Sequence, residues 1–134
     1  MNKLRRMLVS SVLIVSANNA FALACDDFAI KIKNNLPTQF NVSRVNIYGA
    51  TIQPILLQID SNSTASFIIK HTHKGANING GFVLHTLSFP IKMVRINFGF
   101  ENQLIHCHQF EKTVNSDYSV TRIRTPGAVT YSIN

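Results

Sequence analysis

The amino-acid sequence predicts an all-β protein, a single antiparallel β-sandwich of about eight to nine short strands. Three observations support this prediction. Apolar residues after position 25 recur with a period of two, which is the period of a half-buried strand. Clusters of Asn, Gly, Pro and Ser interrupt the apolar stretches at short intervals, as turns do. No stretch after residue 25 has the period of an amphipathic helix.

The first predicted strands alternate apolar and polar residues. In the sequence FAIKIK at 28–33, the apolar side chains fall on one face and the lysines on the other. At 39–48 the alternation shifts by one residue near 43–44, which predicts a β-bulge. Pro54 interrupts the segment 51–59, and we therefore expect that segment to be an edge strand.

The later strands are predicted from the same period and from apolar runs. Segments 81–89 and 91–100 are apolar on both faces, and we expect them to be central, with a reversal of the chain at Pro90 between them. The longest segment without a strand pattern is the loop that follows Lys70. The remaining predicted strands are 65–71, 104–112, 117–124 and 129–133.

Residues 1–24 are predicted to be a secretory signal peptide, and 25–134 the folded domain. A basic start, a short apolar run and a final Ala-Leu-Ala sequence are the parts of such a signal. The apolar run is too short to span a bilayer. Cleavage after Ala24 would make Cys25 the first residue, where it could be lipidated, although Ala22 replaces the Leu usual in lipoprotein signals. We expect a protein that is secreted through the periplasm.

The domain contains two cysteines, Cys25 and Cys107. In an exported protein, two cysteines are expected to form a disulfide. This disulfide would close a loop of about 80 residues and stabilise the fold by about 4 kcal/mol in the chain-entropy model. The alternatives are lipidation of Cys25 and a reactive or metal-binding thiol.

The charge of the domain is moderately basic. The full chain has a net charge of +7; without the three basic residues of the signal peptide, ten Lys and Arg face six Asp and Glu, a net charge of +4. This balance favours an anionic partner. Nucleic acid is not expected, because aromatic residues do not alternate with the cations.

The order of the strands predicts a basic rim at one end of the sandwich. If successive strands run antiparallel, every second connection lies at the same end. That end collects the turn near Gly49, the 72–80 loop and the turns at 101–103 and 125–128. The residues there that are predicted to bind anions are Lys70, His71, His73, Lys74, Arg122 and Arg124.

The chemistry of this rim points to the anionic lipid of a host-cell membrane, with phosphoinositides as candidates. Lys and Arg near an anionic surface contribute about 1 kcal/mol each. Phosphate favours Arg pairs and the N–H groups of Gly-rich turns, and the sequence KGANINGG offers such a backbone. Histidine gains charge below about pH 6.5, so binding is expected to tighten in acid. We expect the protein to act as a monomer.

Two His-x-His pairs offer an alternative, a zinc or copper site. His71 and His73 fall on one face of a strand, as do His106 and His108, and imidazole suits both metals. No carboxylate lies within two residues of either pair in the sequence to orient the imidazole rings. A third alternative is a protein-interaction or adhesin module.

No catalytic motif supports an enzyme. The sequence has no Gly-x-Ser-x-Gly elbow, and its serines fall in predicted turns. Glu101 and Glu111 are separated by ten positions, and nothing in the pattern predicts that they form an acid pair. We expect a binding module without a cofactor.

Residues 28–86 combine an alternating first strand, an aromatic-Gly pair, a hairpin and a Gly-rich stretch. The residues concerned are Ile30-Ile32-Asn34, Tyr48-Gly49, Ile59-Ser63-Phe67 and Gly75-Gly80-Gly81. This pattern resembles that of the aegerolysins and, more distantly, the actinoporins. The resemblance implies a small β-sandwich that binds lipid head groups, in some cases beside a second, pore-forming protein. The chain has no Trp and no amphipathic N-terminal helix, so pore formation by the chain alone is not implied. The composition also resembles that of small virulence factors of Gram-negative bacteria, such as those exported by type II secretion.

Overall fold

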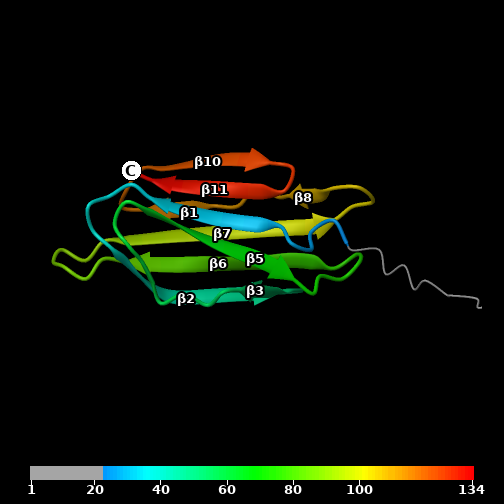
Figure 1. Ribbon diagram of the computed structural model, residues 1–134, viewed down its shortest axis with the longest axis horizontal. Coiled ribbons are helices and arrows are strands. Elements are labelled where there is room, and N and C mark those ends of the chain that lie inside the picture. Colours follow the sequence, from blue (N-terminus) through cyan, green and yellow to red (C-terminus); the bar gives the residue numbers. More distant parts are fainter. Residues whose placement is uncertain (1–22) are drawn as a thin grey trace, which may run out of the picture.

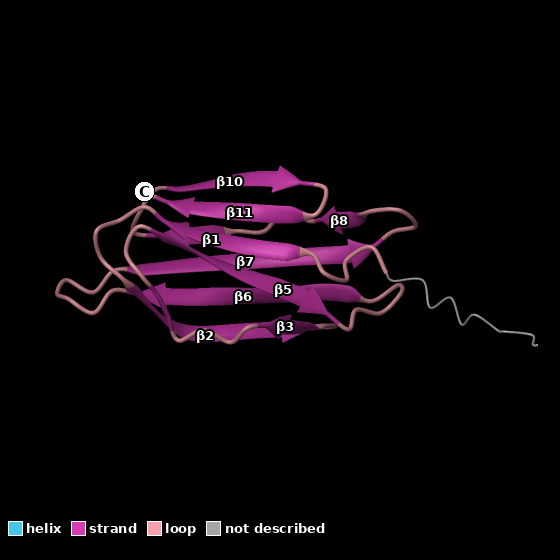
Figure 2. Ribbon diagram, in the orientation of Figure 1, coloured by secondary structure: helices cyan, strands magenta, loops and turns pink. Residues whose placement is uncertain are grey.

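The computed structural model of the protein describes residues 23–134, which form two packed β-sheets (Figures 1 and 2). The all-β prediction is therefore confirmed, whereas most of the predicted signal peptide lies outside the described residues. None of residues 23–134 belongs to a helix with the length and hydropathy needed to cross a bilayer. The strands are β1 (Ala29–Asn34), β2 (Phe40–Tyr48), β3 (Thr51–Gln53), β4 (Gln58–Ile59), β5 (Ser63–Lys70), β6 (Asn77–His85), β7 (Met93–Asn102), β8 (Cys107–Gln109), β9 (Val114–Ser116), β10 (Val120–Thr125) and β11 (Ala128–Ile133).

One sheet, sheet A, has the strand order β10-β11-β1-β5-β3, and the other, sheet B, has the order β4-β2-β6-β7-β8 with β9 also paired to β7. Neighbouring strands are antiparallel except β1 and β11, which run parallel. The prediction of a purely antiparallel sandwich is wrong at this pair. The physical reason is that the first strand inserts between β5 and the last strand, and no hairpin connects β1 to β11.

The core lies between the sheets and takes alternate residues from the strands. In β1, Ile30 and Ile32 are completely buried, whereas Lys31 and Lys33 are exposed on the outer face of sheet A. This is the alternation that the sequence predicts. Each buried aliphatic or aromatic side chain contributes about 1.5–3 kcal/mol relative to an exposed one.

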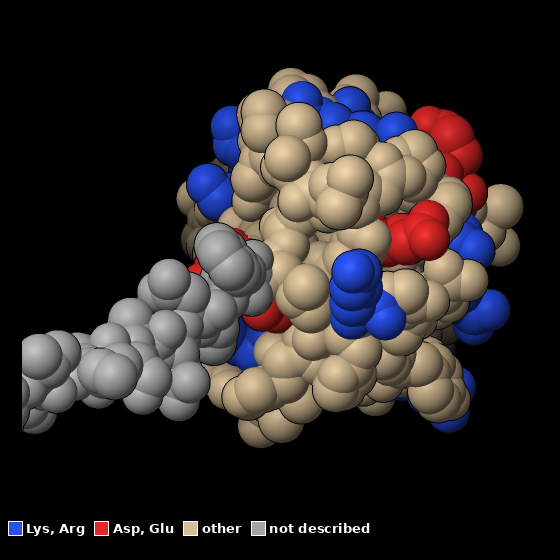
Figure 3. All heavy atoms as spheres, turned by 90° about the vertical axis from the view of Figure 1, so that its right-hand side faces the viewer, with Lys and Arg blue, Asp and Glu red and all other residues tan. Residues whose placement is uncertain are grey.

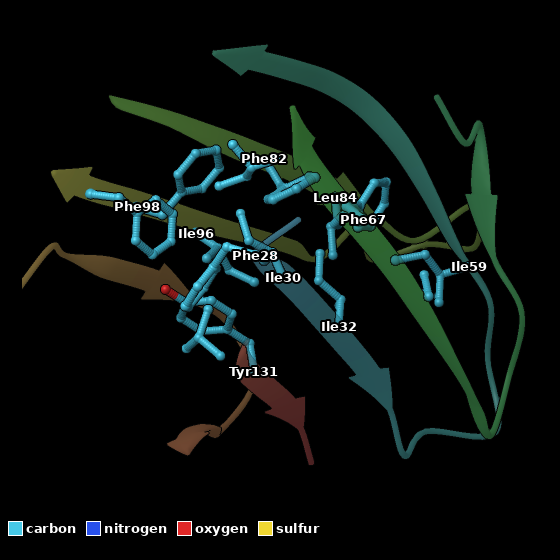
Figure 4. Packing of buried hydrophobic residues seen from close by; sticks show 14 of the residues in the cluster. Phe28, Ile30, Ile32, Ile59, Phe67, Phe82, Leu84, Ile96, Phe98 and Tyr131 are labelled. Carbon is cyan, nitrogen blue, oxygen red and sulfur yellow. The ribbon is translucent and has the colours of Figure 1, made fainter. Parts of the chain in front are cut away.

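Phenylalanine rings fill the centre of this core (Figure 4). Phe67 of sheet A packs against Phe82 of sheet B with ring centroids 4.7 Å apart. Phe28 packs against Phe100 at 4.8 Å. Tilted aromatic pairs at such distances add to the free energy gained from burial, and they join the two sheets along the length of the sandwich.

The segment 51–59 is divided between the two sheets. Residues Thr51–Gln53 form the edge of sheet A, and Gln58–Ile59 form the edge of sheet B. The predicted edge position is correct, but the prediction of one strand is wrong because the chain crosses from sheet to sheet here. The predicted bulge is confirmed, since the register of β2 against β6 shifts between Val42 and Arg44.

The Gly-rich loop after Lys70 is shorter than predicted. Residues 71–76 connect β5 to β6, whereas 77–81 form the first half of β6; all five pair with β7, and 79–81 also pair with β2. The backbone of Gly80 and Gly81 is thus part of the sheet and does not form the phosphate-binding turn that the sequence predicts.

Four connections meet at one end of the sandwich (Figure 1, right), namely β2–β3, β5–β6, β7–β8 and β10–β11. We call it the disulfide end, and it comprises residues 23–28, 49–50, 71–76, 103–106 and 126–127. The prediction that these turns share an end is correct, because the chain reverses near Pro90. The Thr86 N–H donates to the Lys92 carbonyl at 3.0 Å, which closes the β6–β7 hairpin.

The predicted disulfide between Cys25 and Cys107 is present, with Cα atoms 4.7 Å apart. It joins the segment before β1, in sheet A, to the first residue of β8, in sheet B. A disulfide-bonded sulfur is not available for acylation, so the structure favours the disulfide over lipidation of Cys25.

Replacing both cysteines, Cys25→Ser and Cys107→Ser, is expected to lower the free energy of unfolding by about 4 kcal/mol, because the bridge closes a loop with a sequence separation of 82. Urea denaturation followed by circular dichroism measures this change. Reduced wild-type protein should lose the same amount. An unchanged midpoint in the double variant would show that the bridge does not stabilise the fold.

Candidate functional site

Asn102, buried at the end of β7, organises the disulfide end through hydrogen bonds. Its Oδ1 accepts from the Cys25 N–H at 2.6 Å, and its Nδ2 donates to the Thr72 hydroxyl at 2.9 Å and to the His73 carbonyl at 3.1 Å. Asp26 Oδ1 in turn accepts from the N–H and the hydroxyl of Thr72, at 3.0 and 2.6 Å. The network thereby fixes the first turn of the domain, the β5–β6 loop and the end of β7 relative to one another.

The carboxyl of Asp26 is ionised within this network. Burial alone would raise the pKa of Asp26, but hydrogen bonds from Thr72 and Leu23 and the charge of His71 outweigh burial, and the pKa lies below its ordinary value. A lowered pKa in the folded state contributes stability above the unfolded value of about 3.9. That contribution is lost as the pH falls through the folded value.

Three of the four cations of the predicted rim form ion pairs. Lys70, at the end of β5, binds the carboxylate of Asp27. Arg122 and Arg124 both donate to Oε1 of Glu111, at 2.8 and 3.0 Å. Hydrogen bonding and charge from Arg122, with a smaller contribution from Arg124, hold the pKa of Glu111 below its ordinary value. These pairs reduce the positive charge that the rim offers to a ligand.

Arg122 and Arg124 cover the open edge between the sheets. In the register of β10 against β11, they lie opposite the buried residues Tyr131 and Val129. Their side chains are only 23% and 34% exposed, and Glu111 holds them from the sheet B side. Burial raises the pKa of Tyr131, although the two guanidinium groups oppose this. The two arginines therefore contribute mainly to closing the sandwich.

The β5–β6 loop presents the other predicted residues to solvent. His71 has a φ of 54°, and its Nδ1 lies 2.9 Å from the hydroxyl of Thr51. His73 and Lys74 are exposed on the loop. Within the described part of the chain, Lys74 makes no ion pair.

The β7–β8 turn carries two residues that the sequence analysis placed in a strand. Leu104 is 96% exposed and Ile105 is 92% exposed, in a turn closed by a hydrogen bond of 3.1 Å from the Gln103 N–H to the His106 carbonyl. The pairing of β7 with β8 begins only at Cys107, and this position of the turn leaves the two aliphatic side chains in solvent. The only signal for this exposed turn in the sequence is the apolar pair Leu104-Ile105, which is flanked by the polar residues Gln103 and His106.

These two loops enclose a cavity of about 910 Å³ at the disulfide end. Aliphatic side chains and the N-terminal residues form most of its wall, with Lys74 and His106 at the margin. Its lining residues include Leu23, Ala24, Lys74, Leu104, Ile105 and His106. The cavity therefore combines apolar surface with positive charge.

Figure 3 shows the disulfide end from outside the molecule. Lys and Arg side chains lie around this face, separated by broad uncharged surface, and acidic side chains lie beside some of them. In this view uncharged surface predominates, basic side chains lie both along the top and within the face, and acidic side chains lie on its right side.

The four histidines of the alternative metal site are not assembled into one group. The rings of His106 and His108 have centroids 6.4 Å apart, and His108 packs edge-on against Phe110 at 4.9 Å. His71 instead contacts Thr51. Across residues 23–134, no three His, Cys, Asp or Glu side chains are grouped so that they could hold one metal ion.

Replacing Asp26 by Asn should lower the free energy of unfolding at neutral pH by about 1 kcal/mol, because two charge-assisted hydrogen bonds with Thr72 are weakened. The difference from wild type should begin to shrink as the pH falls below about 4, where the carboxyl of the unfolded wild-type chain takes up a proton, and should disappear once the pH lies below the lowered pKa of the folded state. Thermal unfolding over a pH series measures this. Asp27→Asn, which removes only an exposed ion pair, is the control and should change stability little. An equal loss at every pH would contradict the role assigned to the ionised carboxyl.

No protein-family model matches this chain, and no curated protein matches it. The resemblance to the aegerolysins therefore stays a prediction. The function has to be argued from the geometry of the disulfide end.

Proposed function

We propose that the protein is a non-enzymatic module that binds anionic membrane lipid through its disulfide end. The observation that carries this proposal is the nearly complete exposure of Leu104 and Ile105 beside Lys74. Two adjacent aliphatic side chains on a tight turn can enter the headgroup region of a bilayer, and each gains about 1.5–3 kcal/mol when fully buried. A lysine beside them gains about 1 kcal/mol from anionic lipid.

The remaining polar groups of the end suit a phosphate-bearing surface. His73 and His106 are exposed and flank Lys74 and the apolar pair. Their imidazole N–H groups can donate hydrogen bonds to phosphate oxygens. The phosphate of a lipid head group, including that of a phosphoinositide, is the ligand chemistry that these residues favour.

The ion pairs of the end change which predicted residues we expect to contact lipid. Lys70 would have to leave Asp27 to bind a phosphate, and Arg122 and Arg124 would have to leave Glu111. The proposal therefore gives the main role to Lys74 and to the β7–β8 turn. The paired residues contribute less, because Asp27 neutralises Lys70 and the single charge of Glu111 is shared by the two arginines.

Signal-peptide cleavage would add a cation at the same place. Removal of residues up to Ala24, as the sequence predicts, would take Leu23 and Ala24 from the wall of the cavity. The α-ammonium group of Cys25 would then lie where Asn102 Oδ1 now accepts the Cys25 N–H. The processed protein would thus present a wider cavity with one more positive charge.

Replacing Leu104 and Ile105 together by Ser is expected to reduce binding to anionic liposomes by about tenfold or more, because the apolar insertion is lost. Co-sedimentation with vesicles of phosphatidylcholine and phosphatidylserine, with and without a phosphoinositide, measures this. The matched control is Ile55→Ser with Leu57→Ser, two side chains that are each 79% exposed and lie outside the disulfide end. Equal binding by wild type and the first double variant would refute the apolar contact.

Lys74→Glu should weaken liposome binding more than Lys70→Glu does, because Lys70 is already paired with Asp27. Binding should also fall as salt screens the charges. Lys31→Glu, on the outer face of sheet A, controls for the change in net charge and should have the smallest effect. The three variants are compared by co-sedimentation at two salt concentrations. An equal loss in all three would show that binding depends on net charge alone and would remove Lys74 from the site.

A further inference from the structure

The outer face of sheet B contains a second hollow, of about 330 Å³, that shares no lining residue with the cavity of the disulfide end. It lies over the last residues of β2 and the neighbouring parts of β6 and β7, and it is bordered by the segment between β8 and β9. Its polar lining side chains are Asn46, Tyr48, Asn79, Asn97, Lys112 and Thr113.

The floor of this hollow is formed by polar side chains that lie on two glycines, which are not themselves among its lining residues. Gly81 and Gly99 occupy outward-facing positions of β6 and β7. A Cβ atom on Gly81 would lie 2.9 Å from Oδ1 of Asn97, and one on Gly99 would lie 2.7 Å from Cε of Lys112. Glycine weakens a strand interior and commonly marks a place where another group approaches the backbone closely. Here it lets polar side chains lie flat on the sheet.

Three asparagine side-chain amides form part of this floor. The pairing of the strands places Asn46 opposite Gly81, and Gly81 opposite Asn97. Asn79 lies opposite Gly99, with its Oδ1 3.2 Å from the position of a Cβ there. Asn97 Nδ2 donates to the Thr113 hydroxyl at 3.2 Å. Each amide carries two N–H donors and one acceptor oxygen, so the floor can both donate and accept hydrogen bonds.

An aromatic ring stands at the margin of the hollow. Tyr48, at the end of β2, pairs with Asn79 and is 70% exposed. A tyrosine ring offers an apolar face together with a hydroxyl group, and an exposed ring of this kind can stack on a ligand. Lys112 is the only charged side chain among the six.

We infer that this hollow binds a carbohydrate, specifically a pyranose ring of a glycan. Such a ring carries hydroxyl groups around its edge, which both donate and accept hydrogen bonds as the three amides do. Its faces carry C–H groups that pack on an aromatic ring such as Tyr48. A phosphate would be better matched by arginine or by a nest of backbone N–H groups. An apolar ligand would leave three amides without hydrogen bonds, at a cost for each.

The carbohydrate site is tested on a glycan array that displays neutral and sialylated glycans, probed with the labelled protein. Titration calorimetry with the glycan that gives the strongest signal then measures affinity for the variants. Tyr48→Ala and Asn79→Ala are each expected to weaken binding about tenfold or more. Tyr48→Phe, which keeps the ring, should retain most of the affinity.

Asn115→Ala is the matched control. Asn115 is exposed on β9 and pairs with Arg95 on sheet B, but it does not line the hollow. Its replacement should leave binding unchanged, and thermal unfolding should show that all variants are folded. Absence of binding to any glycan, or binding that survives both Tyr48→Ala and Asn79→Ala, would overturn the inference. Liposome binding of these variants should equal that of wild type, so the result is separate from the membrane proposal.

Discussion

Cys25 and Cys107 connect the start of sheet A to sheet B, and Asn102 binds the same region through its buried amide. Elsewhere the sheets meet mainly through apolar side chains, whose attraction is strong but has no direction, and through the pairing of Arg122 and Arg124 with Glu111. The disulfide and the amide hydrogen bonds are directional, and they fix how the two sheets are placed at this end. The loop 71–76 and the turn 103–106 both depend on this link, and their relative position defines the proposed lipid-binding end.

The positive charge that the protein offers to a ligand depends more on which Lys and Arg side chains form ion pairs than on the net charge. Glu111 binds two arginines, and Asp27 binds Lys70, so much of the formal charge of the disulfide end is neutralised locally. The two proposed sites accordingly use few charges. One combines aliphatic side chains with Lys74, and the other combines amides with an aromatic ring. Both lie on a rigid sheet framework, which is where binding residues are commonly held.

Local patterns in the sequence predict most of the strands, the bulge near 43–44, the disulfide and the common end of the turns, but not β9 or the division of 51–59. Contacts between distant residues explain what was missed. The parallel pairing of β1 with β11 leaves no trace in either strand's own alternation. Asn and Gly disfavour strands, so the sequence predicts a loop over 72–80, whereas 77–80 belong to β6. The approach of Asn97 to Gly81 across the sheet accounts for the glycine at the next position. The pairing of Arg122 and Arg124 with Glu111 depends on how the sheets pack, which no local pattern encodes.

The place of β1 between β5 and β11 has a consequence for how the chain matures. The earliest strand to leave the ribosome lacks one of its two neighbours until residues 128–133 have been translated. Pairings between such distant segments form slowly, because the intervening chain must first be ordered. Sheet A therefore stays incomplete until β11 is available to pair with β1.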